Sequence, residues 1–130
     1  MMINLPVMQC DVGCGKCCGP VLCSEAEYAA VARHVREHRV TPKRQGPDVC
    51  PFYQNGQCAV YDARPVPCQL FGHIPAMTCC NGHNVNISKS RERKIMARHV
   101  GDRGQPRALH EFAYGNDAFR LIADHLELLR

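Results

Sequence analysis

Ten cysteines dominate the chemistry open to this 130-residue chain, and five of them fall within its first 23 residues. In Cys14-Gly15-Lys16-Cys17, two residues separate the thiols, and a tight turn of that length can aim both sulfurs at one zinc ion. Redox dithiols share this spacing, but they lie between a strand and a helix and need no further cysteines. The pattern therefore favours metal binding over redox exchange.

Two pairs of adjacent cysteines limit how ions could share these ligands. The side chains of Cys17 and Cys18 tend to diverge, so as ligands they suit two ions, or two corners of a cluster, better than one ion. For Cys79-Cys80 we expect one ligand and one spare cysteine. Cys23 lies outside the clusters, and a small buried hydrophobic residue explains it as well as a ligand does.

The cellular compartment decides between thiolate ligands and disulfides. The segment from Met1 to Pro6 has no basic start, long apolar run or small-residue cleavage site, and no stretch is long and apolar enough to cross a membrane. We therefore expect a cytoplasmic protein without membrane association. Stable disulfides are rare under such reducing conditions, so metal is favoured over a disulfide framework.

Local patterns predict the elements that must position the first cysteines. Ser24 and Glu27 form a capping box for a helix over about residues 24–39. Asn55-Gly56 between two short apolar runs predicts a hairpin that brings Cys50 and Cys58 close together. Pro65 suits the first position of a short helix that carries Cys68.

The remainder is expected to be mostly helical. Residues 72–87, with Cys79-Cys80, look irregular, and helices are expected from Ser88 to about Val100, from near Pro106 to near Tyr114, and from after Asn116 to the C-terminus. The last helix would have an apolar face of Ala118, Leu121, Ile122, His125, Leu126 and Leu129. The predicted fold is a small, metal-stabilised α+β single domain over residues 1–130, with irregular Cys-rich loops and one β-hairpin packed with about four to five helices.

Two blocks of residues resemble the YkgJ family of cysteine-cluster proteins, a family described as zinc- or iron-chelating. The first block is Cys10-x3-Cys14-Gly15-x-Cys17-Cys18. The second is Cys50-Pro51-Phe52, then Gly56-x-Cys58-x-Val60-Tyr61-Asp62-x-Arg64-Pro65-x-x-Cys68-x-x-Phe71, and Cys80-Asn81-Gly82 follows. The resemblance covers about residues 8–84, the cysteine-cluster metal-binding region, and leaves the helical part 88–130 outside it.

The resemblance implies a ligand set of eight cysteines: Cys10, Cys14, Cys17, Cys18, Cys50, Cys58, Cys68 and Cys80. The gap after Cys10 is three residues where the family has two, and the doublet leaves open whether Cys79 replaces Cys80. The family includes a flagellin lysine methylase, so the resemblance implies metal chelation without one reaction.

Eight thiolates divide into two four-cysteine zinc sites, and the adjacent Cys17 and Cys18 could then bind different ions. Iron or an iron–sulfur cluster is the alternative, although the spacing matches neither ferredoxin pattern. We expect a structural or accessory metal-binding protein with a protein partner. The alternatives are an iron–sulfur redox or sensor protein and a metal-dependent group-transfer enzyme, although no motif indicates an enzyme.

Two further features have competing interpretations. Arg64 could donate hydrogen bonds to thiolates or to carbonyls of the metal loop, or it could stabilise its own turn. Tyr61 is expected to pack. The formal net charge is +4, and residues 88–107 are rich in cations: Lys89, Arg91, Arg93, Lys94, Arg98, Arg103 and Arg107. A solvated helix face is the favoured explanation, and nucleic-acid binding is the weaker one.

Overall fold

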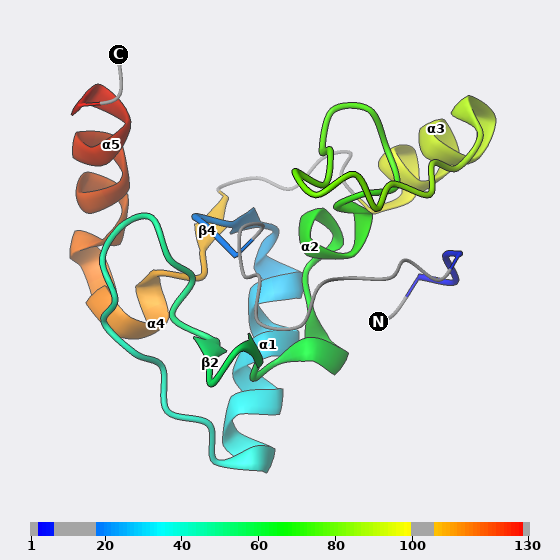
Figure 1. Cartoon of the computed structure of the whole chain (residues 1–130). Coiled ribbons are helices and arrows are strands. Elements are labelled where there is room, and N and C mark those ends of the chain that lie inside the picture. The colour runs from blue at the N-terminus through cyan, green and yellow to red at the C-terminus, as the bar shows by residue number, and fades with distance from the viewer. Residues whose placement is uncertain (1–2, 7–17, 100–105, 129–130) are drawn as a thin grey trace.

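The computed structural model describes residues 3–6, 18–99 and 106–128 (Figure 1). Its elements are, in order, β1 (Leu22–Cys23), α1 (Glu25–His38), β2 (Tyr53–Gln54), β3 (Gln57–Cys58), the 3-10 helix η1 (Tyr61–Ala63), α2 (Val66–Leu70), α3 (Lys89–His99), β4 (Arg107–Ala108), α4 (Glu111–Tyr114), the 3-10 helix η2 (Gly115–Asp117) and α5 (Ala118–Leu128). The small α+β class is confirmed. Cys10, Cys14, Cys17 and the expected helix end at Val100 and Gly101 lie outside the described residues.

Helix α1 begins where the capping box predicts. The Ser24 hydroxyl accepts a hydrogen bond from the Glu27 amide at 3.1 Å, and the Glu27 carboxylate accepts one from the Ser24 amide at 2.9 Å. The helix ends at Arg39, which takes the left-handed conformation common after helix C-termini, with φ 52°. Val31 is fully buried on the inner face of α1.

The predicted β-hairpin is confirmed. Asn55 and Gly56 have φ values of 53° and 77°, as a two-residue turn with both residues left-handed requires. Strands β2 and β3 pair antiparallel, with Tyr53 opposite Cys58. The turn chemistry of two residues thus fixes the register of the segment between Cys50 and Cys58.

A second two-stranded sheet was not expected from the sequence. Strand β4 pairs antiparallel with β1, and the Leu109 amide donates to the Val21 carbonyl at 3.1 Å. The predicted helix from Pro106 is therefore wrong over its first five residues, and α4 begins at Glu111. The pairing prevails over helix propensity because it buries Ala108 and Leu109 almost completely.

Two groups of buried side chains form the interior. The first core cluster lies between α1, the hairpin and α4, and consists of Val21, Cys23, Val31, Cys50, Phe52, Val60 and Leu109. The second core cluster joins α2 to α3 and consists of Val66, Leu70, Ile74 and Ile95. Figure 1 shows α1 in the middle of the molecule, with α3 and α5 at opposite ends.

Helix α5 buries only part of its predicted apolar face. Ala118 and Ile122 are buried, whereas Leu126 is 55% exposed, and Leu129 lies outside the described residues. No helix in the described ranges is long and apolar enough to cross a bilayer.

The loop over residues 41–49, which leads to Cys50, is fastened to α4. His110 has no exposed surface, and its Nε2 lies 3.1 Å from the Gly46 carbonyl oxygen. The Gly46 amide donates to the Tyr114 hydroxyl at 2.9 Å, and Arg44 donates to the Ala113 carbonyl at 2.9 Å. Burial lowers the pKa of His110, although the backbone of Gly46 and Val49 and the charge of Asp48 raise it.

The lowered pKa of His110 predicts acid sensitivity. As pH falls through about 6.5, the unfolded chain takes up a proton before the folded chain does, so the free energy of unfolding falls. We expect a smaller loss of stability between pH 7.5 and 5.5 in the His110→Gln variant, measured by urea unfolding. His38→Gln, an exposed control on α1, should keep the wild-type pH dependence, and equal slopes for all three proteins would contradict the prediction.

Candidate metal centre

Four of the eight predicted ligands lie in or against the first core cluster. Cys50 is a buried member of it, and Cys18, Cys58 and Cys68 are partly buried and pack against it. They come from the segment before β1, the end of the 41–49 loop, strand β3 and helix α2. A backbone hydrogen bond from the Cys50 amide to the Cys18 carbonyl, 2.6 Å long, joins the two sequence blocks directly.

Some features around the Cys50 sulfur oppose its ionisation and others favour it. The pKa of Cys50 is raised to about 11, mainly by burial and also by the nearby Cys58. Backbone hydrogen bonds from Phe52 and Tyr53 lower it, because they stabilise the thiolate. The turn after Cys50 therefore supplies hydrogen-bond donors to a thiolate. A positive charge would be needed in addition to stabilise the ionised form. This donor set fits a metal cation.

The hairpin brings Cys50 and Cys58 close together, as predicted. The Ala59 amide donates to the Phe52 carbonyl at 2.8 Å, which holds the strand after Cys58 against the segment after Cys50. The charge of Cys58 is close enough to affect the Cys50 thiol.

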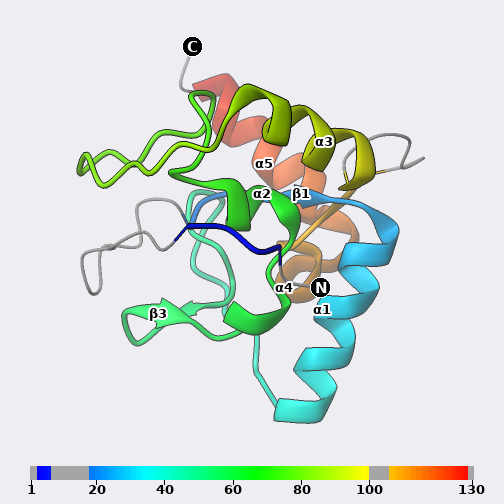
Figure 2. The ribbon, with the colours of Figure 1, turned by 90° about the vertical axis from the view of Figure 1, so that its right-hand side faces the viewer.

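Cys79 and Cys80 are on the irregular segment 72–87. Cys79 is half-buried, Cys80 is exposed, and the Cys79 amide donates to the Asn84 side chain at 2.7 Å. Figure 2 shows this segment projecting on the same side of the molecule as the β2–β3 hairpin. Neither cysteine belongs to the first core cluster.

The described residues do not form a complete site by themselves. Within residues 3–6, 18–99 and 106–128, no three His, Cys, Asp or Glu side chains lie together in an arrangement that could hold an ion. Three of the predicted ligands, Cys10, Cys14 and Cys17, are outside these ranges. The other five predicted ligands, Cys18, Cys50, Cys58, Cys68 and Cys80, lie within these ranges.

Glu27 fixes the helix that carries Cys68. One carboxylate oxygen accepts from the Ser24 amide at the start of α1, and the other accepts from the Val66 amide at the start of α2, at 2.5 Å. A single carboxylate thus caps two helices, because it satisfies one free N–H at each N-terminus. The capping box revealed the first contact, but no local pattern relates Glu27 to a residue 39 positions away.

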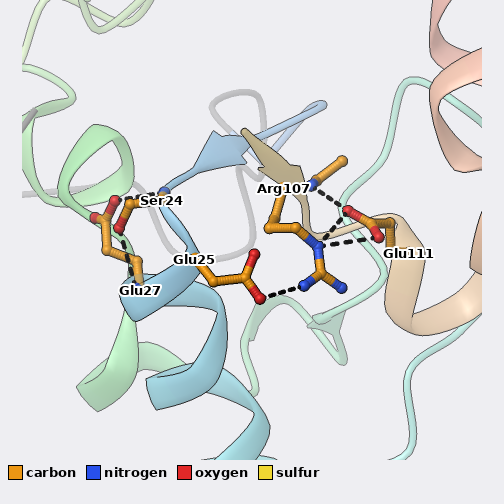
Figure 3. Close-up of polar contacts among 6 residues, drawn as sticks. Ser24, Glu25, Glu27, Arg107 and Glu111 are labelled. Carbon is orange, nitrogen blue, oxygen red and sulfur yellow. Dashed lines mark hydrogen bonds and ion pairs between the residues drawn. The ribbon is translucent and has the colours of Figure 1, made fainter. Parts of the chain in front are cut away.

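Arg107 holds β4 and α4 against α1 (Figure 3). Its guanidinium pairs with Glu25 at 2.7 Å and with Glu111 at 3.2 Å, and lies 3.8 Å from the centre of the Tyr28 ring. Arg107 is therefore not a free cation of a basic helix, as the sequence suggested, but the centre of an ion-pair network between distant segments.

Cys23 lies beside this network and has the properties of a structural thiol. Burial, followed by the negative charges of Glu27 and Glu111, raises the pKa of Cys23 to about 12, although Arg107 opposes the shift. A thiol with so high a pKa is protonated at neutral pH and packs as a small hydrophobic residue.

Arg64 pins its own turn. Its Nε donates to the Tyr61 carbonyl at 3.0 Å, and its guanidinium lies 3.8 Å from the centre of the Tyr61 ring. Tyr61 is 56% exposed, so its ring packs against the Arg64 side chain and not in the core.

Residues 9–77 match the model of the CxxCxxCC family, which is described as a "putative zinc- or iron-chelating domain". The match spans both cysteine blocks up to and including Cys68 and covers just over half of the chain. No curated protein and no solved structure matches the chain.

Because Glu27 caps two helices, its removal is predicted to lower the free energy of unfolding. In Glu27→Ala, both amides lose their acceptor, and we expect the free energy of unfolding to fall by about 2 kcal/mol. Glu37→Ala, an exposed change on the same helix, should stay within about 0.5 kcal/mol of wild type. Urea unfolding followed by circular dichroism measures the free energy of unfolding of both variants. A loss in Glu27→Ala no larger than that in Glu37→Ala would contradict a stabilising role for the double cap.

The burial of Cys23 predicts its protection from alkylation. In the protein as purified, at pH 8, iodoacetamide should label the half-buried Cys79, which is outside the proposed ligand set, and leave Cys23 unmodified, because only a thiolate reacts and Cys23 is a buried thiol. Peptide mass spectrometry with time gives both rates. Protection should vanish in denaturant, and comparable rates in the folded protein would contradict a structural role for Cys23.

Proposed function

Since this chain belongs to the CxxCxxCC family of zinc- or iron-chelating domains, we propose that it binds two zinc ions through cysteine thiolates and has a structural or accessory role. The proposed ligands are Cys10, Cys14, Cys17, Cys18, Cys50, Cys58, Cys68 and Cys80. The observation that carries the proposal is that Cys18, Cys50, Cys58 and Cys68 all pack in or against the first core cluster.

The Cys50 environment supports the choice of a cation. Its thiol is buried close to Cys58, and only backbone hydrogen bonds oppose the rise in its pKa. A bound dication would supply the positive charge that thiolates need, and structural zinc adds about 10–16 kcal/mol to the folding of small domains. The residues of this chain hold the sulfurs in place: Glu27 fixes α2 with Cys68, and the hairpin fixes Cys58 beside Cys50.

Two sites account for the ligand count better than one. A closed zinc site takes four ligands, so eight cysteines fill two. Cys17 and Cys18 are adjacent, and assignment to different ions avoids bending both side chains toward one centre. Cys18 would then belong with the segment of Cys50, to which its carbonyl is hydrogen-bonded.

An iron–sulfur cluster is the second candidate, because the same four-cysteine donor sets bind it. Such a protein would serve as a redox or sensor protein, and the burial of Cys50 would exclude solvent from part of its cluster. Elemental composition and the visible spectrum separate the two candidates.

The deciding experiment is metal and sulfide analysis of anaerobically purified full-length protein. We expect about two zinc ions per chain, no visible colour, and unfolding by a strong chelator. A brown protein containing iron and acid-labile sulfide would refute zinc in favour of the cluster. A folded protein that contains neither metal would refute both.

Two matched variants test the ligand assignment. Cys50→Ser should lower the zinc content by about one ion per folded chain, because it removes a ligand. Cys23→Ala should keep the full zinc content, because Cys23 is proposed to pack and not to bind. An unchanged content in Cys50→Ser, or an equal loss in Cys23→Ala, would show that the assignment is wrong.

A further inference from the structure

Helix α3 accounts for the whole charge excess of the chain. It contains Lys89, Arg91, Arg93, Lys94 and Arg98 against the single acid Glu92. The chain has 16 Lys and Arg and 12 Asp and Glu, so the residues outside α3 hold eleven of each and are formally neutral. The positive charge is therefore a local property of one helix.

The positive charges of these five side chains are not neutralised by ion pairs within the described part of the chain. None of them forms an ion pair with another described residue, whereas Arg107 and Arg120 do. Helix α3 is attached to the body through Ile95, which is 7% exposed and belongs to the second core cluster. In Figure 1 helix α3 lies at the end of the molecule opposite α5.

Three of the cations form a stripe along the helix. Arg91, Lys94 and Arg98 follow the i, i+3, i+7 spacing that places side chains on one face, and this face borders the buried Ile95. Arg91 is half-buried there, and Lys94 and Arg98 are exposed. At 1.5 Å per residue the stripe is about 10 Å long. One strand of duplex DNA presents a phosphate about every 3.4 Å along the axis, so the stripe spans about three phosphates.

The composition of α3 favours a nucleic acid over a protein partner. Protein interfaces rely on buried aromatic or large apolar anchors, and the exposed large apolar residue of α3 is Met96, at 37%. Single strands are bound by stacking on aromatic rings, and α3 has none. Contacts to the duplex backbone need cations alone.

From these observations we propose that α3 binds the phosphate backbone of double-stranded nucleic acid without sequence preference, chiefly through Arg91, Lys94 and Arg98. Helix α3 contains none of the proposed metal ligands. Three phosphate contacts predict weak binding, with dissociation constants of about 10⁻⁴–10⁻⁶ M at physiological salt. They also predict that the logarithm of the binding constant falls with that of salt concentration with a slope of about −2.7.

The test is fluorescence anisotropy of a labelled mixed-sequence DNA duplex titrated with the full chain as purified. The triple variant Arg91→Gln, Lys94→Gln, Arg98→Gln removes the stripe and keeps good helix formers. The control variant Arg33→Gln, Arg36→Gln, Arg120→Gln removes three exposed cations from α1 and α5, so both variants have the same net charge. Circular dichroism establishes that both are folded.

The stripe variant should bind at least about tenfold more weakly than wild type at low salt, with a slope near zero, because it lacks the three contacts. The control variant should stay within about twofold of wild type and keep its slope. Equal weakening of both variants would overturn the proposal, since net charge would then explain binding. Absence of saturable duplex binding at low salt would overturn it too, as would binding to anionic phospholipid vesicles that exceeds binding to the duplex.

Discussion

The buried thiol of Cys50 is the constraint on which the rest of the structure depends. Cys50 belongs to the first core cluster together with Val31 and Phe52, so a residue that would bind the ion is part of the same core as the residues that exclude water. A buried thiolate without a cation is unfavourable, and a protonated thiol is only a small apolar group. With no Trp in the chain, the interior gains little from large side chains, and metal binding would supply the stability that such a core lacks.

Ionic and capping contacts hold the elements that carry the sulfurs. Glu27 ties α2 to the start of α1, and Arg107 ties β4 and α4 to the same end of α1 through Glu25 and Glu111. Strand β1, with Cys23, lies between these two contacts, since it precedes α1 and pairs with β4 (Figure 3). The first turn of α1 is therefore the point at which segments separated by more than eighty residues are fixed relative to one another, and the cysteine-bearing elements are positioned from there.

Local signals in the sequence predicted local structure well. The capping box at Ser24 and the turn at Asn55-Gly56 each depend on the chemistry of a few neighbouring residues, and both are confirmed. The pairing of β4 with β1 was missed because its free energy comes from burying Ala108 and Leu109 against segments far away in sequence, which no local pattern records. For the candidate site, hairpin geometry predicted that Cys50 and Cys58 are close. The placement of Cys18 and Cys68 against the same core depends on tertiary contacts and could not be predicted.

The distribution of charge links the proposed metal sites to the basic helix. Eight thiolates and two zinc ions together add a charge of −4. The body outside α3 is formally neutral before metal binding, so the loaded body would be negative by the amount that α3 is positive, and the whole molecule would have no net charge. The isoelectric point of such a molecule says little about its partners. A phosphate backbone would meet the local potential of a helix attached through Ile95. At physiological ionic strength, charges farther away than about 8 Å contribute little to that potential. Metal binding and polyanion binding can therefore coexist on one small chain because they use charges of opposite sign at different places in the fold.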